Sequence, residues 1–206
     1  MKKLFILFAL FNFLSYAQVP NLLKDINTGS GSSKFGAFTT LANSDILFGI
    51  TTPSSSSSGL WISDGSSIGT KLLKSVPSLF SEFVDYNQKK YFVSTVPNHL
   101  LWRSDGTVLG TDSLPVSGLT SISDFYIANN LLFFIGTTLS EGKELWRTDG
   151  TIAGTFLVKD IWSGNGNGFS SNSYLGIYNN ELFFLANDGI NGNEIWKTNG
   201  TTSGTT

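Results

Sequence analysis

The sequence predicts an all-β chain folded as a β-propeller, in which four-stranded antiparallel blades repeat along the chain. A tryptophan recurs at intervals of 41, 44 and 50 residues, at Trp61, Trp102, Trp146 and Trp196. An Asp-Gly or Asn-Gly pair and then a Gly-Thr pair follow each tryptophan. The composition supports the same prediction, because 22 glycines, 17 phenylalanines and a charged fraction of 14% are typical of short strands joined by tight turns.

Each tryptophan strand is expected to end in a hairpin turn. Asp and Asn tolerate left-handed backbone angles and hydrogen-bond to their own backbone, and glycine takes a positive φ without a steric cost. The four turn dipeptides are Asp64-Gly65, Asp105-Gly106, Asp149-Gly150 and Asn199-Gly200.

A second turn is expected in each unit, where Asn and other polar residues precede an aromatic run. These segments are "LANSDILF" from Leu41, "DYNQKKYFV" from Asp85, "IANNLLFFI" from Ile127 and "IYNNELFFL" from Ile177. With the strand before them, each unit holds four strands in roughly 45 residues, which is the size of a propeller blade. We place the unit boundaries at about 22–70, 71–111, 112–155 and 156–206.

The apolar runs favour a propeller over a single sheet on one core. "LLFFI" and "ELFFL" are nearly continuous rather than alternating, which indicates strands that are covered on both faces. Blades stacked against neighbouring blades meet this condition. We expect the tryptophan of each unit to fill the gap between adjacent blades.

The N-terminus has the layout of a secretory signal peptide. Lys2 and Lys3 precede an apolar stretch, and small residues end the segment at Ala17, so we assign residues 1–17 to the signal and 18–206 to the repeat domain. The apolar stretch is too short to cross a bilayer, so no membrane insertion is expected after its removal. Export is therefore predicted, to the extracellular space or the cell surface, and the absence of cysteine leaves packing alone to stabilise the chain.

The charge excludes some partner classes. The net charge is −2, and removal of the signal takes away two lysines and no acid, which leaves −4. Nucleic acids and anionic membranes select strongly basic surfaces, so neither is an expected partner.

Two interpretations of the chain ends stay open. The segment Leu22–Ile26 could pair with the fourth unit and close a four-bladed ring, which would remove the exposed sheet edges. Alternatively the sequence is the N-terminal piece of a longer array, truncated at the C-terminus, and forms an open arc. We favour the second, because four blades is the lower limit for propellers.

Few residues suggest chemistry. The glycine-rich stretches from Asn27 and Trp162 lack the Lys-Ser/Thr ending of a phosphate loop, so we interpret them as connections between blades. His99 is the only histidine and has no partner at a meaningful spacing. The acids mostly fall at repeat positions, where turn formation explains them, and we predict no catalytic and no cofactor-binding residue. The acids at repeat positions are Asp25, Asp64, Asp105, Asp149, Asp160, Glu144 and Glu194.

One loop could hold a hard cation such as calcium. "NDGINGNE" gathers the oxygen ligands Asp188, Asn191, Asn193 and Glu194 in a glycine-bent segment. The spacing differs from that of an EF-hand loop, and we favour an ordinary hairpin over a calcium site.

The segment "ELWRTDGTIAGTFLVKDI", residues 144–161, resembles the signature of the ELWxxDGT-repeat proteins of bacteria. The match is close there, partial in 59–76 and 100–117, and interrupted by the chain end in 194–206. The resemblance implies a secreted or surface-displayed β-rich repeat protein, often with a C-terminal sorting domain, and brings no catalytic residue.

Together these observations favour a non-catalytic exported propeller that binds extracellular protein or glycan, as an adhesion, surface or matrix component. The alternative is a carbohydrate-active enzyme, a glycosidase or lyase, with acids around the central channel. Glycoside hydrolysis needs two carboxylates roughly 5 to 9.5 Å apart. The enzyme interpretation therefore predicts one unit whose acids break the repeat and converge in a cleft.

Overall fold

The computed structural model describes residues 22–27, 31–53, 57–76, 82–95, 99–116, 118–170 and 173–206, and the predicted signal peptide lies outside these ranges. Within them the chain forms four antiparallel sheets. The first contains β1 (Lys34–Thr40), β2 (Ile46–Thr51), β3 (Gly59–Ser63) and β4 (Lys71–Ser75). The second contains β5 (Val84–Tyr86), β6 (Lys89–Ser94), β7 (Leu100–Ser104) and β8 (Asp112–Leu114). The third contains β9 (Ser121–Ala128), β10 (Leu131–Thr138), β11 (Gly142–Thr148) and β12 (Phe156–Lys159), and the fourth contains β13 (Tyr174–Tyr178), β14 (Glu181–Asn187) and β15 (Asn193–Thr198).

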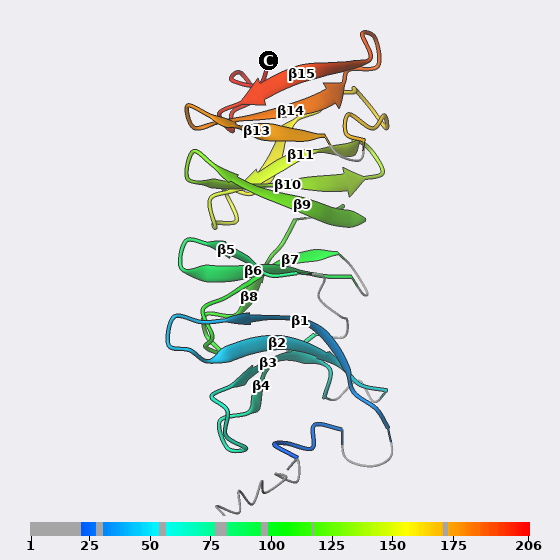
Figure 1. Cartoon of the computed structure of the whole chain (residues 1–206). Helices are drawn as coiled ribbons and strands as arrows, with labels where there is room; N and C mark the ends of the chain where they lie inside the picture. The colour runs from blue at the N-terminus through cyan, green and yellow to red at the C-terminus, as the bar shows by residue number, and fades with distance from the viewer. Residues whose placement is uncertain are drawn as a thin grey trace, which may run out of the picture.

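The four sheets are stacked face to face as successive blades of a β-propeller, with the first and fourth sheets at opposite ends of the stack (Figure 1). The chain runs from the first sheet at one end of the stack to the fourth sheet at the other. An apolar cluster fills each interface between consecutive sheets. The predicted all-β propeller is therefore confirmed. The segment expected to pair with the fourth unit lies at the first sheet instead, since Ile26 packs against its outer face.

The sheets are offset by one strand from the units expected from the sequence. The strand that contains "LVK", β12, was expected to open the fourth unit, but it pairs with the tryptophan strand β11 and closes the third sheet. The pairing of β3 with β4 and of β7 with β8 follows the same rule. The reason is the tight turn after each tryptophan strand, which returns the chain at once beside that strand, whereas longer loops connect one sheet to the next.

The Asn turns form as predicted. Asn129 and Asn130 have φ of 50° and 54°, and Asn179 and Asn180 have φ of 49° and 62°. Positive φ at both central residues defines a type I′ turn, whose twist matches that of the flanking strands. These turns connect β9 to β10 and β13 to β14.

The inner strand β10 is buried on both faces, as its continuous apolar run predicts. In β10, Phe133 and Ile135 pack in the cluster between the third and fourth sheets. Their neighbours Leu132 and Phe134 belong to the cluster between the second and third sheets. All four side chains are at most 4% exposed.

Three of the four tryptophans lie between two sheets, as expected. Trp102, Trp146 and Trp196 each pack in a cluster that joins their own sheet to the preceding one. Phe92 stacks on Trp102 with ring centroids 6.2 Å apart, and Phe134 stacks on Trp146 at 6.4 Å. Burial of an aromatic pair of this size contributes several kcal/mol, at about 25 cal/mol per Å² of apolar surface.

The two end sheets each have one face without a neighbouring sheet. The prediction that the run "ELFFL" is covered on both faces was therefore wrong. In β14 it alternates between buried and half-buried residues, because Leu182 and Phe184 face the third sheet and Phe183 and Leu185 face outward. At the other end, Ile26 packs on Trp61 at the outer face of the first sheet.

The glycine of the turn after the tryptophan strand contacts the preceding sheet. A Cβ atom added to Gly150 would lie 2.8 Å from the hydroxyl of Tyr91 in the second sheet. One added to Gly200 would lie 3.3 Å from the ring of Phe133 in the third sheet. Gly65 belongs to the first sheet, and a Cβ there would meet nothing within 4 Å. The turn glycines are therefore also packing residues between sheets.

Gly150→Ala should lower the free energy of unfolding more than Gly65→Ala. Both glycines have a left-handed backbone, with φ of 92° and 86°, so both substitutions cost about 1 kcal/mol of backbone strain. Only the Gly150 substitution also pushes a methyl group against Tyr91. Urea denaturation of the two variants measures the difference, and equal losses would contradict the packing role.

Candidate functional site

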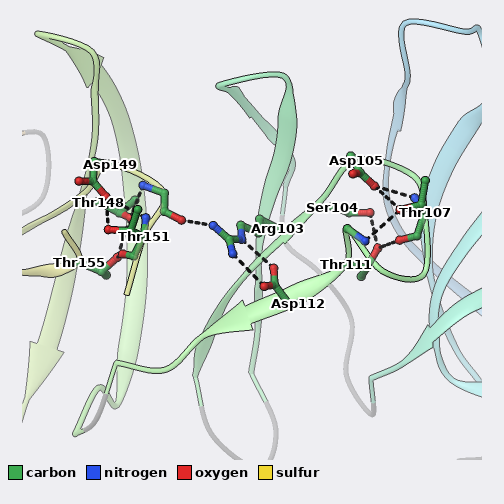
Figure 2. A network of polar contacts seen from close by, with 12 residues as sticks. Arg103, Ser104, Asp105, Thr107, Thr111, Asp112, Thr148, Asp149, Thr151 and Thr155 are labelled. Atoms are coloured by element: carbon green, nitrogen blue, oxygen red, sulfur yellow. Dashed lines mark hydrogen bonds and ion pairs between the residues drawn. The ribbon is translucent and has the colours of Figure 1, made fainter. Parts of the chain in front are cut away.

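A relay of hydroxyl groups closes the turn after each tryptophan strand. In the third sheet, the amide of Gly150 donates to Thr148 Oγ1 at 2.9 Å, and Thr155 Oγ1 donates to the Thr151 carbonyl at 2.6 Å. The two hydroxyls of Thr148 and Thr155 are 2.6 Å apart. Because the Thr155 proton is already used, Thr148 is the donor in that contact, and each hydrogen of the relay has an acceptor (Figure 2).

All four turns contain the same relay, so it is a property of the repeat. Seven of the eight hydroxyl residues are buried, which makes their mutual hydrogen bonds necessary. The pairs are Ser63–Thr70 at 2.7 Å, Ser104–Thr111 at 2.6 Å, Thr148–Thr155 at 2.6 Å and Thr198–Thr205 at 2.7 Å.

The acids of these turns are occupied by hydrogen bonds within the turn. Asp149 Oδ1 accepts from the Thr151 hydroxyl at 2.7 Å and from its amide at 2.8 Å, and these bonds hold the pKa of Asp149 below its usual value. Asn199 Oδ1 has the same role for Thr201 in the fourth turn. A neutral amide suffices there, so the turn needs the oxygen acceptor rather than the charge.

Arg103 connects the second sheet to the third (Figure 2). Its Nε and Nη2 donate to the two carboxylate oxygens of Asp112, at 2.7 and 2.8 Å, while Nη1 donates to the carbonyl of Gly150. The hydrogen bonds with Asp112 raise the pKa of Arg103, and the guanidinium lowers the pKa of Asp112. Arg103 therefore fixes the position of the next turn along the stack.

The tips of three of these turns expose large apolar side chains. Ile68 is 93% exposed, Leu109 is 98% exposed and Ile152 is 63% exposed. Each lies three or four residues after the turn Asp, and Val108, beside Leu109, is 59% exposed. The fourth turn has Thr202 and Ser203 at these places.

These turns all lie on the same side of the stack (Figure 1). Each of the first three sheets therefore contributes one exposed apolar residue to the turns on this side; we call Ile68, Leu109 and Ile152 together the apolar row. Single exposed apolar residues are normal on a soluble protein, but exposed apolar side chains at the same turn in successive repeats are typical of a surface that contacts a partner. The apolar row is a candidate functional surface. Sequence analysis missed it, although the repeat position that it occupies was visible.

The four calcium candidates lie in the β14–β15 hairpin. Asp188 Oδ1 accepts from the amides of Ile190 and Asn191 at 2.9 and 2.7 Å, and Oδ2 accepts from the Asn191 side chain at 2.7 Å. Asn193 and Glu194 open β15, and both are exposed. The oxygens of Asp188 thus accept the hydrogen bonds that close the hairpin turn. Calcium binding by this loop stays a prediction.

One of the acids assigned to repeat positions, Glu144, is a buried carboxylate in the third sheet. Glu144 is fully buried, and its Oε1 accepts from the amides of Trp162 and Gly168 at 3.1 and 3.0 Å. Burial, with a smaller contribution from Asp160, raises the pKa of Glu144 to about 7 despite these bonds. The glycine-rich stretch after Trp162 therefore folds around Glu144 as it passes from the third sheet to the fourth.

A hollow of about 610 Å³ lies at the outer face of the first sheet, under residues 22–27. Phe35 and Phe38 line it and are 70% and 75% exposed. In the second, third and fourth sheets, the preceding sheet covers this face. The first sheet has no preceding sheet, so the apolar side chains of the same face line the hollow. Residues 28–30, the middle of the first glycine-rich stretch, lie outside the described residues.

Across the described ranges, no group of three or more His, Cys, Asp or Glu side chains could hold a metal ion. Within the same ranges, no helix has the length and apolar character needed to span a membrane.

No model of a known protein family matches the sequence, and no curated protein matches it. Among solved structures, an α-L-arabinofuranosidase from Clostridium thermocellum is similar, with a TM-score of 0.36 and 12% identity, over 85% of this chain and 71% of that chain. At this distance, no site residue is transferred from that enzyme.

Thr148→Val should destabilise the protein by about 1 to 3 kcal/mol, because it leaves the Gly150 amide without its acceptor at a fully buried position. Thr148→Ser keeps the hydroxyl and should cost much less. Chemical denaturation of both variants measures the two losses. A valine variant as stable as the wild type would show that the relay does not contribute to stability.

Acid should destabilise the protein through the turn carboxylates. Hydrogen bonds lower the pKa values of Asp64, Asp105 and Asp149 in the folded chain. Their stabilisation is therefore present above the unfolded pKa of about 3.9 and is lost as the pH falls through the lower folded values. Replacing all three by Asn, the residue of the fourth turn, should flatten the fall in Tm below about pH 4. Thermal unfolding followed by circular dichroism tests this, and an equally steep fall in the triple variant would refute it.

Proposed function

We propose that the chain is a non-catalytic, exported β-propeller repeat protein that binds an extracellular partner through the side of the stack that carries the tryptophan-strand turns. The apolar row is the observation that carries this proposal. Isoleucine and leucine tips offer apolar area and no hydrogen-bonding groups, so a protein surface suits them better than a glycan does.

The architecture supports presentation of a surface. The turns are fixed by the hydroxyl relays and by Arg103, so their tips are held at the spacing of the sheets. A rigid scaffold that presents repeated loops is typical of binding proteins, since less conformational entropy is lost when the partner binds. Export through the N-terminal signal, followed by residence at the cell surface or in the matrix, is part of the same proposal.

The use of the acids supports the non-catalytic part of the proposal. Asp64, Asp105 and Asp149 are bound within their turns. Glu144 and Asp160 do converge in one sheet, as the enzyme interpretation requires, but Glu144 is fully buried and two backbone amides hold it. A general acid must reach the glycosidic oxygen, and Glu144 has no exposed surface for it.

The triple variant Ile68→Ser, Leu109→Ser, Ile152→Ser tests the proposal. Purified protein is applied to surfaces coated with collagen, fibronectin or laminin and to a printed glycan array. We expect the wild type to bind a protein surface and the triple variant to lose at least about tenfold in affinity, because removal of buried apolar contact costs about 1.4 kcal/mol or more.

The double variant Leu139→Ser, Ile190→Ser is the matched control. These residues are each 86% exposed and lie in the β10–β11 and β14–β15 hairpins, at the opposite end of the strands. Binding should persist in this variant. Binding to glycans alone, or unchanged binding in the triple variant, would contradict the proposal. Turnover of a polysaccharide that Glu144→Gln abolishes would replace it with the carbohydrate-active alternative.

A further inference from the structure

The strand pairing of the third sheet brings two carboxylates together. Leu145 of β11 is paired with Lys159 of β12 in antiparallel register. Continued by one residue, this register places Glu144 of β11 opposite Asp160, the residue that follows β12. Side chains at such positions lie on one face of the sheet with Cβ atoms about 5 Å apart, and like charges there are destabilising. Asp160 accordingly acts electrostatically on Glu144.

Each carboxylate has one oxygen bonded to the loop and one buried oxygen without a hydrogen-bond partner. Glu144 Oε1 accepts the amides of Trp162 and Gly168, and Asp160 Oδ2 accepts the amide of Gly164 at 3.1 Å. Glu144 Oε2 and Asp160 Oδ1 are both buried and have no hydrogen-bond partner. Buried oxygens of this kind are costly, and two of them on opposed carboxylates point to a missing positive group.

The described side chains do not provide that positive group. The three ion pairs found among the described residues involve neither Glu144 nor Asp160. The neighbouring Lys159 is directed elsewhere, since its ammonium donates to the Thr205 carbonyl at 2.8 Å and lies 5.2 Å from the centre of the Trp196 ring.

We propose that Glu144 Oε2 and Asp160 Oδ1 bind a divalent cation of the calcium type, enclosed by the glycine-rich loop of residues 161–168. Calcium prefers carboxylate and carbonyl oxygens and accepts irregular coordination, so carbonyls of the loop and water would complete its shell. Gly168 supports a close enclosure, because a Cβ there would lie 2.5 Å from Glu144 Oε1. The cation would hold the third sheet to the loop that leads into the fourth.

The other sheets provide an internal comparison. In the first sheet the equivalent pair is Gly59 with Ser75, and in the second the same register places Leu100 opposite Pro115. Neither pair carries a charge. Among the described sheets, the third alone has both acids, so the site is not a general requirement of the blade.

A shared proton is the competing occupant. Burial disfavours the charged form of Glu144, so a proton held by the two carboxylates would also neutralise the pair. A proton would neutralise the pair but would leave calcium without effect on stability. The response to calcium therefore separates the two occupants.

Thermal unfolding of the purified protein near neutral pH, in a chelator and in increasing calcium, tests the site. We expect Tm to rise with calcium and to saturate, by on the order of 5 °C at a hundredfold excess over the dissociation constant, and calorimetry to give one ion per chain. Glu144→Gln and Asp160→Asn should each remove the calcium-dependent rise. Both keep the shape of the side chain, so if one fails to fold the other carries the test.

Two variants serve as controls. Glu194→Gln changes the same repeat position in the fourth sheet, where the side chain is exposed, and Asp188→Asn changes the β14–β15 hairpin. Both should keep the full calcium response. The same Tm in chelator and in calcium for the wild type would overturn the proposal, as would a rise that persists in both site variants. A rise lost only in Asp188→Asn would place the ion in the hairpin and overturn it equally.

Discussion

Burial of strands on both faces, between two stacked sheets, is the constraint on which the rest of the structure depends. A strand such as β10 has no polar face, so it is stable only between two other sheets. The stacked pair Phe134–Trp146 shows how this works, because its rings fill the space toward the preceding sheet. Every sheet needs a neighbour of the same kind, which is why the chain repeats one pattern.

The turn after each tryptophan strand fixes how neighbouring sheets are placed relative to each other. Thr148 and Thr155 close the loop, Gly150 touches the preceding sheet, and Arg103 reaches across to its carbonyl. The residues that recur most clearly in the sequence are therefore used for construction. The residues available for function are those that the repeat leaves free, at the tips of the turns and in single departures such as the acid pair of the third sheet.

Much of the fold could be predicted from the sequence, because turn chemistry is local. The Asn turns and the Asp-Gly turns follow from side chains that act within a few residues of themselves. The predicted unit boundaries differ from the observed sheet boundaries by one strand, because a repeating pattern does not indicate at which strand one unit ends and the next begins. The pairing of Glu144 with Asp160 could not be predicted, because it depends on the register of β11 and β12, which shifts between Leu145 and Trp146.

The uncovered outer faces of the first and fourth sheets have a consequence for motion. Energetic coupling in a stacked array runs from neighbour to neighbour, so opening is least costly at the sheets that have only one neighbour. Amide hydrogens of β10 and β11 should exchange with solvent only when the whole array opens. Those of β1 and β15 should exchange through local fraying, so the molecule melts inward from its two ends.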